Sequence, residues 1–114
     1  MIVGIGCDIV KIDRMMKSLD APVMNKILTP QERELCASFS RQRKAEWIAG
    51  RFAAKEAIYK AIHTQVDTHV WLIEVLVNQD GSPCCVSFPD YLVQISIAHE
   101  KEYAIAYAMV LTKE

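Results

Sequence analysis

The most informative stretch of the chain runs from Gly50 to Ala61 and reads GRFAAKEAIYKA. At about 100° per residue, its small side chains gather on one side of a helix, at Gly50, Ala53, Ala54, Ala57 and Ala61. Bulkier side chains gather on another side, at Ile48, Phe52 and Tyr59. We therefore expect a helix that packs against two neighbours. Ser40 can cap its start, so the helix is expected from Arg41 to about His63.

The chain before this helix predicts one strand and shorter helices. Ile2–Val10 is a β-branched apolar run, which is typical of a strand buried on both faces. Val23–Leu28 fits either a short helix or a loop. A stronger helix start follows at Thr29-Pro30-Gln31-Glu32, where Thr29 can cap, Pro30 suits the first helical position and Glu32 completes a capping box. That helix is expected to end near Ser38.

The chain after the long helix predicts strands. Strand-like apolar runs occupy residues 70–77, 84–88, 93–98 and 103–111. A turn signal at Asn78–Gly81 separates the first two runs, and a tight turn around His99–Glu102 joins the last two. The order of one strand, two or three helices and then an antiparallel β-meander predicts an α+β fold, in a single domain that covers residues 1–114.

Composition and charge exclude several classes of protein. The chain has 114 residues, of which 52% are hydrophobic and 24% charged, so disorder is excluded. Thirteen basic against fourteen acidic residues argue against a general nucleic-acid coat. Residues 41–60, however, hold six basic and two acidic side chains, a net charge of +4. This concentration suggests an anionic ligand, although a solvated helix face would have the same pattern.

Nothing in the sequence suggests a membrane or an oxidising compartment. The longest apolar run, Ala104–Leu111, is far shorter than the roughly 20 residues of a spanning helix, and the N-terminus lacks the features of a signal peptide. The four cysteines show no C-x-x-C spacing, so neither a zinc site nor a disulfide framework is expected. We expect a protein of the reducing cytoplasm with no membrane partner.

Three polar residues are candidates for a functional site. Asp8 interrupts an apolar strand, where a carboxylate must be paired, hydrogen-bonded or bound to a metal. Glu56 and Lys60 are four residues apart, and so lie together on the long helix at the boundary of its small and bulky faces. Asp8 and Glu56 could together bind a hard cation. The simpler alternatives are a local partner for Asp8 and a surface ion pair between Glu56 and Lys60.

His99, in the turn after the strand-like run at residues 93–98, is either an ordinary surface histidine or a donor to a phosphate, helped by nearby Ser96. No Ser-His-Asp or Cys-His arrangement is recognisable, so nucleophilic catalysis by the protein has no support.

Three segments resemble the holo-[acyl-carrier-protein] synthases, the short, single-domain branch of the 4′-phosphopantetheinyl transferases. Residues 4–14, GIGCDIVKIDR, are similar to the family's G-I-G-x-D-I-V-x-I-x-R opening. Residues 51–61 match its R-F-A-A-K-E-A-x-x-K-A signature at every specified position. Ser96-Ile97-Ala98-His99 resembles its C-terminal S-x-S-H strand, and Gly81-Ser82-Pro83 fits its G-x-P turn. The resemblance spans nearly the whole chain.

The resemblance implies transfer of 4′-phosphopantetheine from coenzyme A to a serine of an apo acyl-carrier protein, in fatty acid biosynthesis. It implies Mg²⁺ held by Asp8 and Glu56, and a homotrimer with active sites between subunits. Glu56, directly or through a metal-bound water, would accept the serine proton. The coenzyme A phosphates would meet the basic residues Lys60, Arg51, His99 and Lys44. Arg14 matches the region that contacts the carrier protein.

The sequence departs from the family at three places. Ala98 replaces a common serine, the link at residues 62–68 lacks glycine, and only residues 89–92 remain where many relatives insert a helix. These departures affect the adenine and carrier-protein contacts more than the metal site. The alternatives are a binding domain whose basic helix docks an acidic partner or RNA, and a degenerate transferase retained as a structural subunit.

Overall fold

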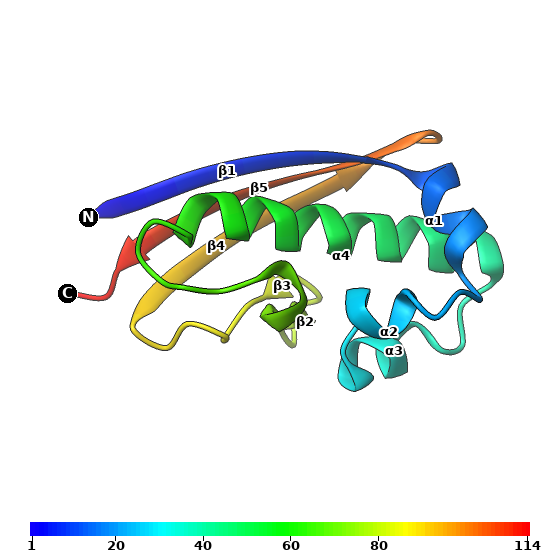
Figure 1. Cartoon of the computed structure of the whole chain (residues 1–114), viewed down its shortest axis with the longest axis horizontal. Coiled ribbons are helices and arrows are strands. Elements are labelled where there is room, and N and C mark those ends of the chain that lie inside the picture. The colour runs from blue at the N-terminus through cyan, green and yellow to red at the C-terminus, as the bar shows by residue number, and fades with distance from the viewer.

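A computed structural model describes all 114 residues and shows an α+β fold, as predicted (Figure 1). The elements in chain order are β1 (Ile2–Lys11), α1 (Ile12–Ser18), α2 (Met24–Ile27), α3 (Pro30–Cys36), α4 (Arg41–Ile62), the 3₁₀ turn η1 (Val70–Leu72), β2 (Leu76–Val77), β3 (Pro83–Cys84), β4 (Tyr91–His99) and β5 (Tyr103–Thr112).

The main sheet has three antiparallel strands in the order β1-β5-β4, and α4 packs across one of its faces. In Figure 1 the long helix lies beside this sheet, with α1, α2 and α3 gathered near its first turns. A separate two-stranded hairpin joins β2 to β3. The antiparallel strands of the second half therefore divide between two sheets instead of forming one continuous meander.

Two glycines set the distance between β1 and α4. A Cβ atom on Gly6 would lie 1.9 Å from the carbonyl oxygen of Ala57, and one on Gly4 would lie 1.8 Å from that of Ala61. Both distances are far below van der Waals contact, so only glycine permits this approach of strand to helix. The small face predicted for α4 is fully buried here, and it begins at Gly50, which packs against Ile97 of β4.

The helix starts follow the predicted capping chemistry. The Glu32 backbone N–H donates to the Thr29 hydroxyl, and the Thr29 N–H donates to Glu32 Oε1, which completes the capping box of α3. Ser40 Oγ accepts from the Arg43 N–H at the start of α4. The long helix ends at Ile62, one residue before the predicted end, and the segment from Val23 to Leu28 contains the short helix α2.

Four local predictions were wrong. Of residues 84–88, which were expected to form a strand, only Cys84 lies in one, paired with Leu76. Residues 12–18 form helix α1, for which no helix was expected, although its buried residues Ile12 and Met15 are spaced to face one side. Residues 70–77 are mostly not a strand, since only the last two residues pair in β2. The strand β1 is covered on one face only, because Ile5 and Ile9 on its other face are exposed.

All four cysteines are free thiols. None of the helices combines the length and the apolar character that crossing a membrane requires.

Candidate active site

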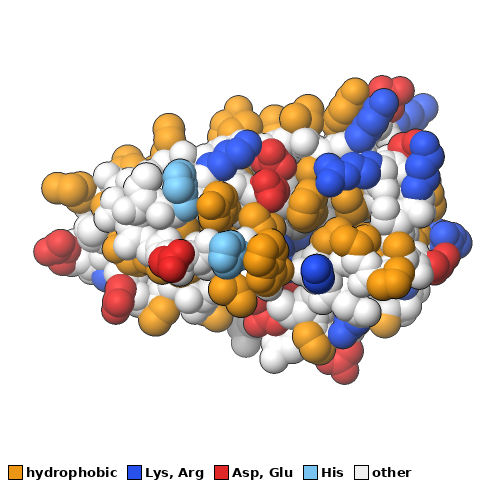
Figure 2. Space-filling view, viewed as in Figure 1, with side chains coloured by type: hydrophobic (Ala, Val, Ile, Leu, Met, Phe, Trp, Pro, Cys, Tyr) orange, Lys and Arg blue, Asp and Glu red, His pale blue; other side chains and the backbone are white.

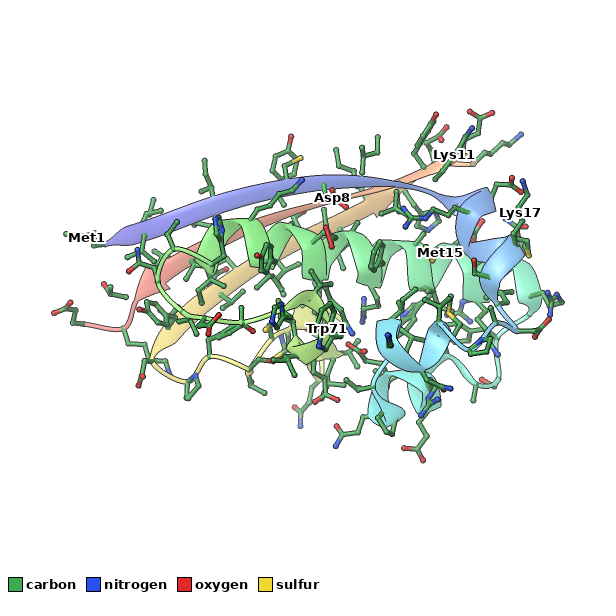
Figure 3. All side chains as sticks on the ribbon, in the orientation of Figure 1. Met1, Asp8, Lys11, Met15, Lys17 and Trp71 are labelled. Carbon is green, nitrogen blue, oxygen red and sulfur yellow. The ribbon has the colours of Figure 1, made fainter.

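Asp8 and Lys60 meet where β1 crosses the last turns of α4. Along β1, Asp8 shares its inward direction with Gly4, Gly6 and Val10, because alternate residues of a strand face the same side. Figure 3 shows Asp8 pointing from β1 toward α4. Its Oδ1 lies 3.1 Å from Lys60 Nζ, which also donates to the Cys7 carbonyl at 3.0 Å. The close packing of Gly4 and Gly6 against α4 brings Asp8 within reach of Lys60.

Glu56 completes a cluster of two acids and a base. It is half-buried and forms no ion pair within 4 Å, so the alternative of a surface ion pair between Glu56 and Lys60 is wrong, whereas Asp8 does have a local partner, Lys60. Burial raises the pKa of Glu56, and the charge of the Asp8 carboxylate raises it further, while Lys60 and Arg14 oppose the rise. A carboxylate with a raised pKa beside a second carboxylate is suited to accept a proton or a cation.

The two carboxylates at this site suit a magnesium ion whose remaining coordination positions are filled by substrate oxygens and water. No group of three or more His, Cys, Asp or Glu side chains occurs together anywhere in the chain, so the protein alone offers no full cation cage. Mg²⁺ typically takes one or two carboxylates and fills its other positions with phosphate oxygens and water. Asp8 and Glu56 match that smaller requirement.

An apolar pocket of about 270 Å³ adjoins Glu56. Its hydrophobic walls include Phe52 of α4 and Trp71 of η1, and its basic residues are Arg14 and Lys26. The Arg14 guanidinium stacks over the Phe52 ring, 5.4 Å from its centroid. Figure 2 shows acidic, basic and hydrophobic side chains adjoining near the middle of this face of the molecule. The predicted residue Arg14 therefore belongs to the surroundings of Glu56.

His99 lies in a different place from this cluster. It faces the α4 side at the end of β4 and borders a pocket of about 230 Å³, with Arg43, Trp47 and Gly50. Because Gly50 meets β4 whereas Ala57 meets β1, the helix crosses from one edge strand to the other. Within one chain, the His99 pocket and the Asp8–Glu56 cluster thus lie at opposite edges of the sheet.

Ser96 does not assist His99, contrary to expectation. The two residues are three positions apart on β4 and so face opposite sides of the sheet, with Ser96 exposed on the face that α4 leaves uncovered.

Arg51 borders the His99 pocket, and two of its five N–H donors are already used, because its guanidinium donates to the carbonyls of Val75 and Leu76. Its Nε donates to the Val75 carbonyl at 3.1 Å, and its guanidinium stacks on Trp47, 4.2 Å from the ring centroid. Lys44 lines a third pocket, apart from His99. The structure thus brings Arg51 and His99 together and leaves Lys44 outside this group.

The positive charge predicted for residues 41–60 is partly internal. The Lys55 side chain is 1% exposed, and its Nζ lies 2.5 Å from Glu32 Oε1 and 2.6 Å from the Ile27 carbonyl. Burial lowers the pKa of Lys55, and the Glu32 carboxylate opposes that shift. With Arg51 also buried, two of the six basic residues are withdrawn from the surface. The loss of two surface charges weakens the alternative hypothesis that this helix binds RNA by charge alone.

A comparison with known protein families shows which family the chain belongs to. The family model described as the 4′-phosphopantetheinyl transferase superfamily matches residues 4–108. The chain belongs to this superfamily.

Individual members of the superfamily align over the full length. A holo-[acyl-carrier-protein] synthase of Bacillus cereus is 40% identical over 114 residues, covering 96% of each chain, and one of Bacillus anthracis has the same identity and coverage. A crystal structure of a holo-(acyl-carrier-protein) synthase from Bacillus anthracis in complex with CoA (3′,5′-ADP) superposes with a TM-score of 0.90, at 39% identity and 99% of each chain. The coenzyme A complex of the Helicobacter pylori synthase superposes with a TM-score of 0.74, at 28% identity, over 93% of this chain and 98% of that one.

Sequence reasoning missed several pocket residues that the transferase fold brings to these sites. Trp47 and Arg43 border the His99 pocket, about one and two turns of α4 before Gly50, and both lie within the basic segment. Trp71 and Lys26 border the pocket beside Glu56. The net charge of residues 41–60 was a signal for Arg43, whereas nothing local in the sequence places Trp71 near Glu56.

Proposed function

We propose that this chain is a holo-[acyl-carrier-protein] synthase, which transfers 4′-phosphopantetheine from coenzyme A to a serine of apo acyl-carrier protein in fatty acid biosynthesis. The observation that carries the proposal is the cluster of Asp8, Glu56 and Lys60, formed by the two segments that match the family's signatures. Full-length similarity to synthases, one of them in complex with CoA (3′,5′-ADP), supports the same reaction.

The reaction requires charge stabilisation more than covalent participation by the protein. The serine oxygen attacks the phosphorus that bears pantetheine, the bond to the second phosphate breaks, and adenosine 3′,5′-bisphosphate leaves with the electron pair. Transfer of this kind depends on positioning and on compensation of phosphate charge. Lys60 Nζ, half-exposed beside Asp8, is placed to donate to a phosphate oxygen.

Asp8 and Glu56 would hold Mg²⁺, which would offset the negative charge of the coenzyme A diphosphate when bound. Glu56 would also accept the serine proton. Its raised pKa supports that role, because a base whose pKa lies closer to neutral pH transfers a proton more effectively.

The carrier protein would dock against the pocket beside Glu56. Arg14 and Lys26 offer positive charge to an acidic partner, and Phe52 and Trp71 offer an apolar surface between them. Such a patch of charge around an apolar centre is typical of a protein-binding surface. It would deliver the acceptor serine to Glu56.

The two edges of the sheet support an active site shared between subunits. Coenzyme A carries a diphosphate and a separate 3′-phosphate, while the Asp8–Glu56 cluster and the His99 pocket lie at opposite edges of one chain. If the β1 edge of one subunit meets the β4 edge of the next, both groups contact one coenzyme A. His99, Arg51 and Arg43 would then bind phosphates of a molecule whose diphosphate lies at the neighbour's Glu56.

A homotrimer is the proposed assembly. The face of the sheet opposite α4 exposes apolar side chains, among them Ile5 (72% exposed), Ile9 and Tyr107 (both 59%). An exposed apolar patch of this kind is typical of an interface, here between copies of the chain. We place the assembly in the cytoplasm, and the four free thiols fit that reducing compartment.

The direct test is intact-mass measurement of an apo acyl-carrier protein incubated with the purified chain, coenzyme A and Mg²⁺. The expected result is a mass gain of one phosphopantetheinyl group that requires all three. Absence of any gain across a panel of apo carrier proteins would contradict the proposal, and Mg²⁺-independent transfer would contradict the role of Asp8 and Glu56.

A further inference from the structure

A separate pocket of about 280 Å³ lies where α2 and α3 meet the first turns of α4. Its apolar lining consists of Leu19, Met24, Leu28, Cys36, Ala37 and Ile48. It shares no residue with the pocket beside Glu56 or with the pocket at His99. A ligand held here would therefore leave the proposed transfer site free.

The two remaining lining residues, Lys44 and Arg33, make the pocket positive. The four ion pairs of the chain use Lys17, Arg41, Lys55 and Lys60, so neither Lys44 nor Arg33 has a carboxylate partner. Arg33 donates to the neutral side-chain amide of Asn25. No acidic residue lines the pocket.

The charge of Lys44 acts on the interior of this pocket. Burial raises the pKa of the Cys36 thiol, and Lys44 is the strongest of the charges that oppose this rise. Lys44 is only partly exposed, and Cys36 is 2% exposed. An uncompensated ammonium group thus lies close to a buried apolar wall, an arrangement that favours an anion with a hydrocarbon tail.

We propose that this pocket binds a medium-chain aliphatic carboxylate. The alkyl chain enters beside the accessible residues Leu19 and Ala37 and rests on the nearly buried side chains of the pocket floor, Met24, Leu28 and Ile48. The carboxylate is bound by Lys44 and Arg33. Small-molecule pockets typically have volumes of about 300–1,000 Å³, so this cavity of about 280 Å³, just below that range, accommodates a short chain in preference to a long one.

The test is a titration of the full-length chain with sodium octanoate, in the absence of coenzyme A and carrier protein. The methyl signals of Met24 and Ile48, followed by NMR, should shift and saturate. Octyltrimethylammonium has the same alkyl chain with the opposite charge, and it should give no saturable shift over the same concentrations. Because the assay contains no transfer substrate, its outcome is independent of the proposed transferase function.

Two variants and one control make the test specific. Lys44→Gln should weaken octanoate binding about fivefold, as expected for the loss of one partly exposed charge contact. Ala37→Leu should remove binding by filling the pocket at an exposed position, which the fold tolerates. The control Lys101→Gln removes an exposed charge in the β4–β5 turn and should leave the octanoate affinity unchanged.

Three results would overturn the proposal: no shift at Met24 and Ile48 with millimolar octanoate, equal binding of octyltrimethylammonium, or unchanged octanoate affinity in both pocket variants. If Lys44→Gln failed to fold, Ala37→Leu and the comparison of the two ligands would still decide the matter.

Discussion

The fold disfavours the ionised form of the Glu56 carboxyl group, which suits this residue to accept a proton but lowers the stability of the folded chain. Its folded-state pKa is raised by burial and by Asp8, so the folded chain binds this proton more tightly than the unfolded chain does. The resulting loss of folding free energy is absent below the ordinary pKa of 4.5 and reaches its full value once the pH exceeds the raised pKa. In the presence of a chelator, stability should therefore fall as the pH rises through that window.

Glu56→Gln removes both the proposed base and the destabilisation that the ionised Glu56 carboxylate causes. We expect the variant to lose transfer activity by at least about 100-fold, the usual contribution of a general base. In chelator at pH 7, its melting temperature should be higher than that of the unmodified chain, and the fall with pH should be shallower. The control Glu34→Gln alters an exposed carboxylate on α3 and should change neither quantity. A lower melting temperature for Glu56→Gln would contradict the assigned pKa shift.

Lys55, the neighbour of Glu56, has a structural role. Lys55→Met would leave Glu32 buried without its cation, and we expect a loss of about 3–5 kcal/mol in the free energy of unfolding. Denaturant titration measures this loss. Lys101→Met, at an exposed position, should change the free energy by less than about 0.5 kcal/mol. Similar losses in the two variants would show that the Lys55–Glu32 pair does not stabilise the fold.

At the level of elements, the contact between β1 and α4 both holds the fold together and assembles the site. Gly6→Ala would place a methyl group against the Ala57 carbonyl and push the strand away from the helix. We expect a destabilisation of about 1–3 kcal/mol, as for other overpacked contacts. Transfer activity should fall as well, because Asp8 moves away from Lys60. Unfolding and activity assays on the same sample measure both effects.

Gly81→Ala is the control for that substitution. Gly81 has a φ of +88° and open space around it, so an added Cβ there causes only local backbone strain in the β2–β3 turn. Its activity should be retained. Equal loss of activity in both glycine variants would argue against the close approach as the cause.

Elements whose signals are local could be predicted from the sequence. Thr29 and Ser40 cap their own helices, and the small face of α4 follows from residue spacing alone. The segment 70–77 could not be predicted, because distant side chains bind its backbone. Glu32 accepts from the Val75 N–H, Arg51 donates to the Val75 carbonyl, and Ser87 accepts from the Glu74 N–H. These partners replace the strand pairing that its β-branched residues favour.

The candidate site was predictable to a similar degree. Glu56 and Lys60 lie one helical turn apart, and Asp8 stands out in an apolar strand, so their grouping could be inferred. The position of His99 relative to them depends on the order of strands in the sheet, which residue spacing does not specify.

At the level of the whole molecule, the uncovered face of the sheet accounts for the proposed trimer. Ile5→Glu places a charge on that face without disturbing the core, since the Ile5 side chain is exposed in the single chain. Light scattering should then report the mass of one chain in place of three, and activity should fall with it. Val86→Glu, an equally exposed position outside the main sheet, should leave the mass unchanged. A full-sized assembly of Ile5→Glu would place the interface elsewhere.

An active site divided between subunits makes the most direct prediction. Glu56→Gln and His99→Ala alter opposite edges of the chain, and each variant alone should be nearly inactive. If the two are unfolded together and refolded as mixed trimers, about a quarter of the sites should combine an intact Glu56 from one subunit with an intact His99 from its neighbour. Intact-mass measurement of phosphopantetheinyl transfer should therefore show that the mixture regains about a quarter of the unmodified activity. A mixture no more active than its two components would contradict a shared site.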